Sequence, residues 1–147
     1  METLKILLTG LIFALMSWVN PSGNTFDTEA ATGISFHQGT WDEALQMASE
    51  EGKPIFLDIS ASWCGPCKRL KAITFTDPEV GKLFNAGFIN MVVDGEKGEG
   101  IHLARKFKIR GYPSLIFIDS DGQLIAQATG YRTPEQLIGM GRQVLER

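Results

Sequence analysis

Cysteine is scarce in this sequence: the chain of 147 residues contains two, Cys64 and Cys67. A disulfide between residues so close in the chain closes a very small loop and constrains little of the unfolded state. Stability is therefore excluded as the reason for the pair. Clustered metal ligands are also missing, because zinc takes three or four protein ligands and the other candidates, His37 and His102, each stand alone in their segments. We expect no metal site and no organic cofactor.

Charge of one sign is not concentrated anywhere either. The chain has 14 basic and 17 acidic residues, which gives a formal net charge of −3. The basic residues are scattered apart from two short groups, 68–71 and 105–108, and both fall on helix-like patterns typical of a solvated face. Binding of nucleic acid requires a clustered basic surface, so the sequence excludes nucleic acid as a partner.

A hydrophobic run long enough to cross a membrane is the third absence. Residues 4–19 are apolar except at three positions, but the uninterrupted part is shorter than the ~20 residues that a spanning helix needs. The pattern fits the core of a signal peptide with Lys5 as its positive flank. A buried N-terminal helix is the disfavoured alternative, because a helix that is apolar on every side needs the core of a large protein around it. We assign 1–23 to a signal peptide or, since no clean cleavage site is present, an uncleaved membrane anchor, and 24–35 to a linker.

Alternating helical and strand-like segments predict an α/β domain over residues 36–147. Two capping boxes, which begin at Thr40 and Thr133, mark the starts of the first and last helices. The expected order is helix, strand, helix, helix, strand, helix, strand, strand, helix. The four expected strands are residues 55–59, 88–94, 115–119 and 124–129.

The connections between the strands predict a mixed sheet with helices on both faces. The early strands are joined by helical crossovers and should be parallel. The pair Asp121-Gly122 predicts an antiparallel hairpin for the last two strands. Between the second and third expected strands, the glycine-rich segment 95–100 predicts a loop, and residues 101–107 predict a helix.

The two cysteines lie where a buried strand leads into a helix. At such a helix start, unpaired backbone amides and the positive end of the helix dipole favour a thiolate on Cys64. The thiolate is the attacking species in disulfide exchange. We expect Cys64, nearer the surface, to attack a substrate disulfide, and Cys67, one turn further in, to resolve the mixed disulfide.

Asp58 is the one charged residue in the apolar strand that precedes the cysteines. Burial of a carboxylate is costly and usually raises its pKa. A strand and a tight turn can bring Asp58 beneath the helix of Cys64 and Cys67, where it would accept the proton of the Cys67 thiol. The alternative is a residue at a strand end that faces solvent or caps a turn.

At Trp63-Cys64-Gly65-Pro66-Cys67-Lys68 the chain resembles thioredoxin, and the resemblance covers residues 36–147. The spacing to Asp58, the segment Ile109–Leu115 and Gly130 also match. The resemblance implies a thioredoxin fold in which Asp58 is the buried proton acceptor. It further implies a substrate groove with a cis-proline that faces the cysteines, a strand-pairing backbone at the residue before it, and a shielding tryptophan. The implied substrate-binding residues are Trp63, Gly65, Pro66, Tyr112, Pro113 and Gly130.

Two further segments sharpen the resemblance within the family. Residues 52–58 and 74–80 resemble the C-terminal domain of the bacterial membrane protein that carries electrons to the periplasm, and its exported relatives. Two positions depart from thioredoxin. Asn90 stands where thioredoxin has a lysine near its buried aspartate, and Tyr112 stands where isoleucine is usual, a change expected to alter partner choice.

These patterns predict a periplasmic, monomeric thioredoxin-like reductase. Its substrates would be disulfides in proteins, and a membrane electron donor would recharge it, because an exported reductant works in an oxidising compartment. The Gly-Pro dipeptide resembles that of reducing thioredoxins, with potentials of about −270 mV. Two alternatives remain: a disulfide oxidase or isomerase, and a non-redox peptide-binding module that uses the groove beside Pro113.

Overall fold

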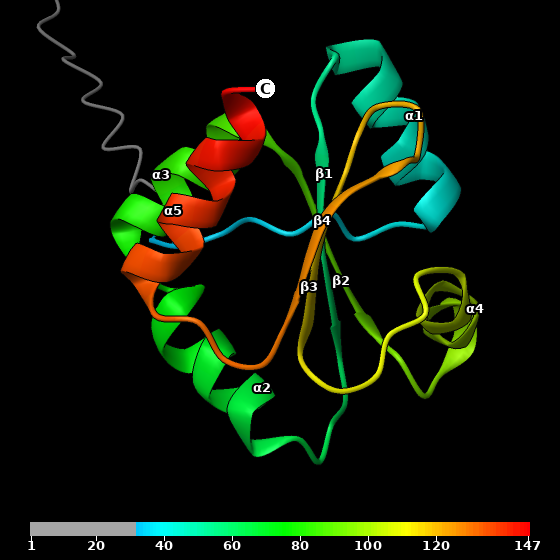
Figure 1. The fold of residues 1–147 in the computed structure, drawn as a ribbon, viewed down its shortest axis with the longest axis vertical. Coiled ribbons are helices and arrows are strands. Elements are labelled where there is room, and N and C mark those ends of the chain that lie inside the picture. The colour runs from blue at the N-terminus through cyan, green and yellow to red at the C-terminus, as the bar shows by residue number, and fades with distance from the viewer. Residues whose placement is uncertain (1–31) are drawn as a thin grey trace, which may run out of the picture.

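The computed structural model describes residues 32–147, so the predicted signal or anchor (1–23) and most of the predicted linker lie outside the described residues. Within the described part, a four-stranded sheet stands between two layers of helices (Figure 1). The strand order is β2-β1-β3-β4. The strands are β1 (Ile55–Ser60), β2 (Ile89–Asp94), β3 (Ser114–Ile118) and β4 (Leu124–Thr129).

The parallel pairing of the first two strands and the antiparallel pairing of the last two agree with the prediction, whereas the pairing of β1 with β3 was not predicted. β1 pairs with β2 in parallel, whereas β3 is antiparallel to both β1 and β4. The parallel pair needs a long crossover, which the helices after β1 provide. The turn between β3 and β4 closes at Gly122, whose φ of 82° lies in the left-handed region that glycine tolerates. The α/β architecture with a mixed sheet is therefore confirmed.

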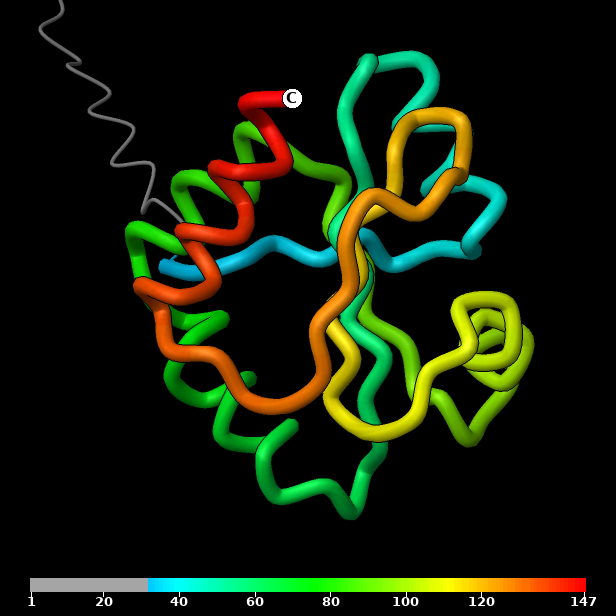
Figure 2. Tube along the Cα trace, viewed as in Figure 1, coloured from blue at the N-terminus to red at the C-terminus, as the bar shows by residue number. Residues whose placement is uncertain are grey.

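The helices form two groups, one on each side of the sheet (Figure 2). One face is covered by α1 and α4, and the other by α2, the short π-helix η1, α3 and α5. Their bounds are α1 (Trp41–Glu51), α2 (Gly65–Arg69), η1 (Leu70–Thr74), α3 (Pro78–Gly87), α4 (Gly98–Lys106) and α5 (Pro134–Leu145).

The alternation of side chains along β1 divides the core into two clusters. Ile55, Leu57 and Ile59 pack toward α1 and α4, whereas Phe56 packs toward the helices of the other face. Phe56 contacts the rings of Phe84 and Phe117 with centroids 4.8 and 5.2 Å apart. Both faces of β1 are buried, as the apolar run in the sequence predicts.

Local sequence signals set the helix starts. Thr40 and Thr133 each form a complete capping box, the first with Glu43 and the second with Gln136. Asp77 caps α3 by accepting from the N–H groups of Glu79 and Val80. These side chains satisfy amide groups that have no partner within the helix.

The start of α4 differs from the prediction. The glycine-rich segment 95–100 was expected to be a loop, but the helix already begins at Gly98. Tertiary contacts outweigh the low helix propensity of glycine here. The carboxylate of Glu99 accepts the Trp41 N–H at 2.9 Å, and a Cβ at Gly100 would collide with the backbone of Asp94.

The first described residues already pack onto this domain. Ile34 donates its N–H to the Phe75 carbonyl at 2.7 Å and packs against the cluster around Phe56. Contacts with the domain therefore include residues before 36, the expected boundary. None of the helices in residues 32–147 is both long enough and apolar enough to cross a membrane.

Candidate active site

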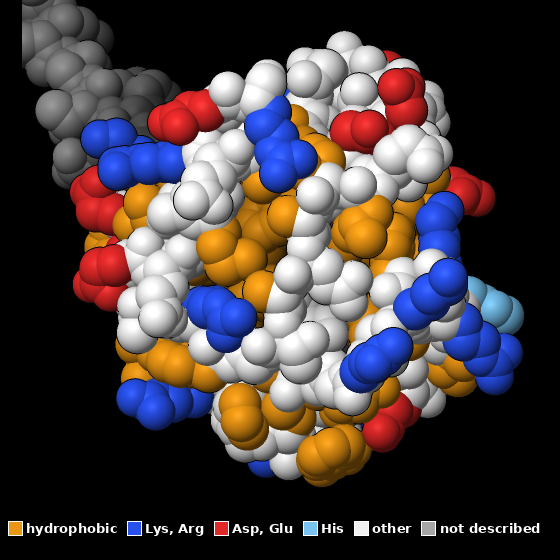
Figure 3. All heavy atoms as spheres, in the orientation of Figure 1, with side chains coloured by type: hydrophobic (Ala, Val, Ile, Leu, Met, Phe, Trp, Pro, Cys, Tyr) orange, Lys and Arg blue, Asp and Glu red, His pale blue; other side chains and the backbone are white. Residues whose placement is uncertain are grey.

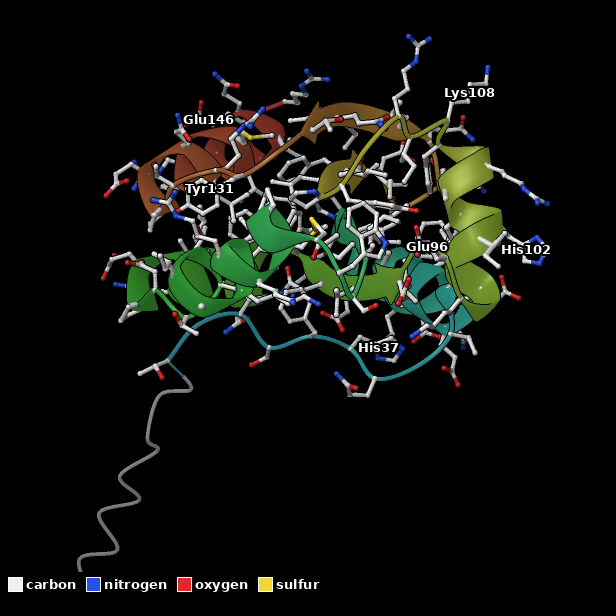
Figure 4. The ribbon with its side chains drawn as sticks, turned by 90° about the horizontal axis from the view of Figure 1, so that it is seen from below. His37, Glu96, His102, Lys108, Tyr131 and Glu146 are labelled. Atoms are coloured by element: carbon white, nitrogen blue, oxygen red, sulfur yellow. A yellow bond between two sulfur atoms is a disulfide. The ribbon has the colours of Figure 1, made fainter. Side chains whose placement is uncertain are left out.

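The cysteine pair lies at the end of the molecule where β1 leads into α2. Cys64 is the N-cap residue of α2 and forms a disulfide with Cys67. The Cys67 N–H donates to Cys64 Sγ at 3.2 Å. Figure 4 views the molecule from this end and shows the disulfide near the centre, between Glu96 and Tyr131. A donor aimed at Sγ and the start of the helix both favour negative charge on that sulfur once the disulfide is reduced.

The exposure of the two cysteines differs from the expectation. Cys64 was expected nearer the surface, but its exposed fraction is 2% against 1% for Cys67. Ala61 is buried in the same small cluster, and the Tyr112 ring packs against it. The position of Cys64 at the helix tip, rather than its exposure in this oxidised state, distinguishes it from Cys67.

Asp58 is fully buried, on the face of β1 that packs toward α2 and η1. Its Oδ2 accepts from the Ser60 hydroxyl at 2.6 Å, and its Oδ1 has no partner within the described residues. Burial raises the pKa of this carboxyl to about 6, although the Ser60 hydrogen bond and the charge of Lys71 act in the opposite direction. The alternative of a solvent-facing residue at a strand end is wrong.

The strand register shows which residues adjoin Asp58. Val92 of β2 and Leu115 of β3 stand directly opposite it, and both are apolar. Asn90 lies opposite Phe56, one pleat away, and its amide donates to the Phe84 carbonyl at 3.1 Å. The Asn90 amide thus bonds to the backbone of α3 and does not act on Asp58 as a charge would.

The cation near Asp58 is Lys71, which comes from another element and is not among the predicted site residues. Lys71, in η1, lies four residues after Cys67. Residues four apart share one side of a helix, and Cys67 faces inward. The four-residue spacing from Cys67 is the sequence feature from which the position of Lys71 near the site could have been predicted.

The predicted groove residue Pro113 stands immediately before β3, after a cis peptide bond from Tyr112. The Pro113 carbonyl accepts the Gly130 N–H at 2.8 Å, which ties the start of β3 to the end of β4. None of the backbone–backbone hydrogen bonds within residues 32–147 involves Tyr112, which lies just before the strand. Its backbone groups are therefore available to a partner at this edge of the site.

Trp63 lies exposed at the same end of the molecule, beside Tyr112. Its side chain is 66% exposed, its Nε1–H donates to Glu96 Oε2 at 3.0 Å, and its ring meets the Tyr112 ring edge-on at 6.0 Å. A Cβ at Gly95 would stand 2.7 Å from the Tyr112 ring, so glycine allows that close approach. Glu96 was not predicted, because only the fold brings its loop to Trp63.

Gly65 and Pro66 are exposed in the first turn of α2. Hydrophobic side chains gather at the lower end of the space-filling view, where β1 leads into α2 (Figure 3). On the far side of α2, the Arg69 guanidinium lies 4.5 Å from the centre of the Tyr131 ring. All the predicted site residues therefore come from segments that meet at this end.

Residues 32–147 hold no cluster of three metal-binding side chains.

Comparisons with known proteins agree with this arrangement. The sequence profile of the family described as thioredoxin-like domain matches residues 41–145. The chain is 34% identical over 118 residues to the thiol:disulfide interchange protein DsbD of Escherichia coli strain K12, a match that covers 77% of this chain and 21% of that protein. The chain thus spans about a fifth of the length of such curated relatives.

Two solved structures are similar in fold and sequence. The solution structure of a proposed disulphide-isomerase from Bacteroides thetaiotaomicron has 40% identity and a TM-score of 0.68, and the match covers 80% of this chain and 98% of that one. The oxidised C-terminal domain of DsbD from Neisseria meningitidis has 26% identity and a TM-score of 0.60, with coverage of 75% and 97%. The predicted thioredoxin fold and the likeness to this domain are confirmed. The chain belongs to the thioredoxin-like family of disulfide oxidoreductases, with Cys64 and Cys67 as its cysteine pair.

Proposed function

We propose that this protein is an exported reductase of protein disulfides. The Cys64 thiolate attacks one sulfur of a substrate disulfide, forms a mixed disulfide and releases the first substrate thiolate. Cys67 then attacks Cys64 Sγ, which releases the second substrate thiolate and closes the Cys64–Cys67 disulfide. Two electrons pass from the protein to the substrate. The disulfide-bonded structure corresponds to the oxidised end of this cycle.

The observation that carries the proposal is the buried carboxyl beneath the cysteine helix. Cys67 must lose its proton before it attacks, and a buried thiol does so only with an acceptor nearby. The pKa of Asp58 is about 6, so the carboxyl is mostly ionised at neutral pH and is still basic enough to accept a proton. Asp58 is therefore assigned as the proton acceptor for Cys67, and Cys64 as the nucleophile.

Substrate binding is assigned to the rim around the disulfide. An extended substrate segment would pair with the backbone of Tyr112, in the manner of strand addition, with Pro113 and Gly130 beside it. Trp63 would cover the substrate disulfide, while Gly65 and Pro66 leave the helix tip open to it. The unpaired backbone of Tyr112 and the exposure of Trp63 support this assignment.

The proposal extends to export and recharging. An N-terminal signal or anchor in 1–23, followed by a linker, would place the domain in the periplasm, and the likeness to a domain of DsbD supports that location. A reductant there needs a membrane electron donor, and a monomer leaves the site open to both donor and substrate. Fractionation of cells, with the mass of the mature protein, tests export. Retention of the protein in the cytoplasm would contradict it.

A second candidate function is disulfide isomerisation or oxidation, favoured by the likeness to the proposed disulphide-isomerase. The equilibrium reduction potential of the purified protein separates the two. A value near the −270 mV of thioredoxin supports the reductase, whereas a value toward the −120 mV of a strong oxidant supports the alternative. A Cys64→Ser variant that kept full activity would instead support a non-redox peptide-binding module.

A further inference from the structure

The Asp58 carboxyl is held by one direct hydrogen bond, and the residue that donates it, Ser60, lines a cavity. Its Oδ2 accepts from Ser60 Oγ, whereas its Oδ1 has no partner within residues 32–147. A cavity of about 230 Å³ lies alongside, lined by Ser60, Lys71, Val92 and Asp94 among others. Val92 stands opposite Asp58 in the sheet, which places the cavity next to the carboxyl.

This cavity has both polar and apolar side chains in its lining and is large enough for water. One water occupies about 30 Å³ in the liquid and needs two or more polar partners to stay bound inside a protein. Ser60 both lines the cavity and donates to Asp58, so it connects the buried carboxyl with this space. A carboxyl that takes a proton in each cycle needs such a connection to return the proton to solvent.

The π-helix supplies the cation at the cavity. In η1 the Phe75 N–H donates to the Leu70 carbonyl at 2.9 Å, the wider turn that defines a π-helix. Lys71 is the second residue of that turn. Its head reaches solvent, and its side chain lines the cavity. Such π-turns occur frequently at functional sites.

The other groups around Asp58 leave Lys71 without a competing cation at the cavity. On β1 the neighbour is the uncharged Ser60, and the opposite residues on β2 and β3 are apolar. Asp94 at the end of β2 also lines the cavity, but its Oδ2 lies 3.6 Å from Lys97 Nζ, which offsets its charge. From the helix side, Cys67 is uncharged in the disulfide.

We propose that Ser60 and Lys71 are positioning residues that keep Asp58 ionised at neutral pH, Ser60 by its direct hydrogen bond and Lys71 by its charge across the cavity. The inference rests on the proposed function, in which Asp58 accepts the Cys67 proton. Both side chains stabilise the carboxylate against the desolvation that burial imposes. Neither residue touches the reacting sulfurs; each acts through Asp58.

The test is a direct titration of the Asp58 carboxyl in the full-length protein by carbon NMR with labelled aspartate. Lys71→Met, which keeps the apolar stem, should raise the pKa of Asp58 by about half a unit, a modest shift because the ammonium head is exposed. Lys71→Arg should restore the wild-type value. Ser60→Ala should raise it as well, and Ser60→Thr should restore it. Lys82→Met, on α3 away from the cavity, is the matched control and should change nothing.

A kinetic measurement accompanies the titration. The rate of the Cys67 step is measured as the release of a substrate thiol from a mixed disulfide at Cys64. The pH at which this rate is half its maximum should be higher in Lys71→Met, by the same amount as the pKa of Asp58. In an Asp58→Asn background, Lys71→Met should have no further effect. An equal effect of Lys71→Met with and without Asp58 would overturn the inference, since Lys71 would then act on the cysteines directly.

The outcomes separate this inference from the proposed function. A carboxyl titration unchanged in both Lys71→Met and Ser60→Ala overturns the inference, whatever the reduction potential is. A shifted titration in a protein with an oxidising potential supports the inference and removes the reductase direction. A shifted titration without a shifted pH profile overturns the claim that the two residues serve the proton acceptor.

Discussion

The two faces of the sheet share the strand β1 but differ in chemistry. Toward α1 and α4, β1 presents Ile55, Leu57 and Ile59, all fully buried in an apolar cluster. The other face begins with Phe56 but continues with Asp58 and Ser60, which are buried and polar. The first face contributes hydrophobic stabilisation alone. The second face contributes hydrophobic stabilisation around Phe56, but it also holds the Asp58 carboxyl, whose burial opposes folding.

Hydrophobic burial on the apolar face offsets the free energy that burial of the Asp58 carboxyl costs. A domain of this size has a net stability of only about 5–15 kcal/mol, and a buried ionised carboxyl takes a sizeable part of that.

Cys64→Ser should lower the rate of disulfide reduction by about a thousandfold or more, because the remaining cysteine, Cys67, lies inside the first turn of α2 rather than at its tip and lacks a resolving partner. Loss of the short-loop disulfide should change stability little. The measurement is turnover of a protein disulfide, with unfolding followed by urea. Cys67→Ser is the matched variant and should instead accumulate a mixed disulfide at Cys64. Equal activity of the wild type and Cys64→Ser would refute the assigned role.

Leu57→Ala, on the apolar face, should lower the free energy of unfolding by about 2–5 kcal/mol, as is typical for truncation of a fully buried leucine. The rate of reduction per folded molecule should stay the same, since Leu57 faces away from α2. Chemical denaturation and turnover at a temperature well below the midpoint measure the two effects. A large loss of turnover in the folded variant would show that the two faces are coupled.

Asp58→Asn should stabilise the oxidised protein at pH 7 or above and slow the Cys67 step. The pKa of Asp58 is raised from 3.8 to about 6, and at about 1.4 kcal/mol per pKa unit this amounts to roughly 3 kcal/mol of stability lost to the buried charge. The asparagine amide is uncharged at every pH and removes that loss.

The pH dependence of this effect has a definite sign. Because the pKa is raised, the folded state binds more protons than the unfolded state between pH 3.8 and about 6. Wild-type stability therefore rises as the pH falls through this window, whereas that of Asp58→Asn lacks this contribution. The gain from the substitution should disappear below pH 4. Urea unfolding at pH 4 and pH 7.5 measures it, and an equal gain at both values would contradict the assigned pKa.

Glu96→Ala should have the smallest effect. It removes the hydrogen bond to Trp63 Nε1, which is exposed and worth about 1 kcal/mol or less. Stability should hardly change, but the Trp63 ring should become more mobile and KM for a protein disulfide should rise a few-fold. Fluorescence anisotropy in a variant that keeps Trp63 as the sole tryptophan measures the mobility. Glu96→Gln retains an acceptor and should resemble the wild type.

Much of the fold could be predicted because its signals are local. The capping boxes at Thr40 and Thr133 each lie within four consecutive residues, and both form as expected. The order of helices and strands, and the directions within the β1–β2 and β3–β4 pairs, follow from periodicity and connection length, and they agree with the structure. The start of α4 at Gly98 has no side-chain cap, and the contact that Glu99 makes there is with Trp41, far away in the sequence, so no local signal marks it.

The candidate site was predictable to the extent that its residues lie close in the chain. Cys64, Cys67 and Asp58 fall within ten residues, so a strand, a turn and a helix bring them together. Glu96 could not be identified in the same way, because it lies 33 residues beyond the tryptophan to which it bonds. No local pattern records which loop will meet Trp63.

The sequence by itself determined the α/β class, the directions within the β1–β2 and β3–β4 pairs, and a cysteine pair at a helix start with a carboxyl upstream, since each depends on spacing along the chain. The tertiary structure decided what surrounds that carboxyl. The register of β1 with β2 places Val92 rather than Asn90 opposite Asp58, and the π-turn brings Lys71 to the cavity instead. Electrostatic environment depends on distances through space, and these are set only when distant segments pack together.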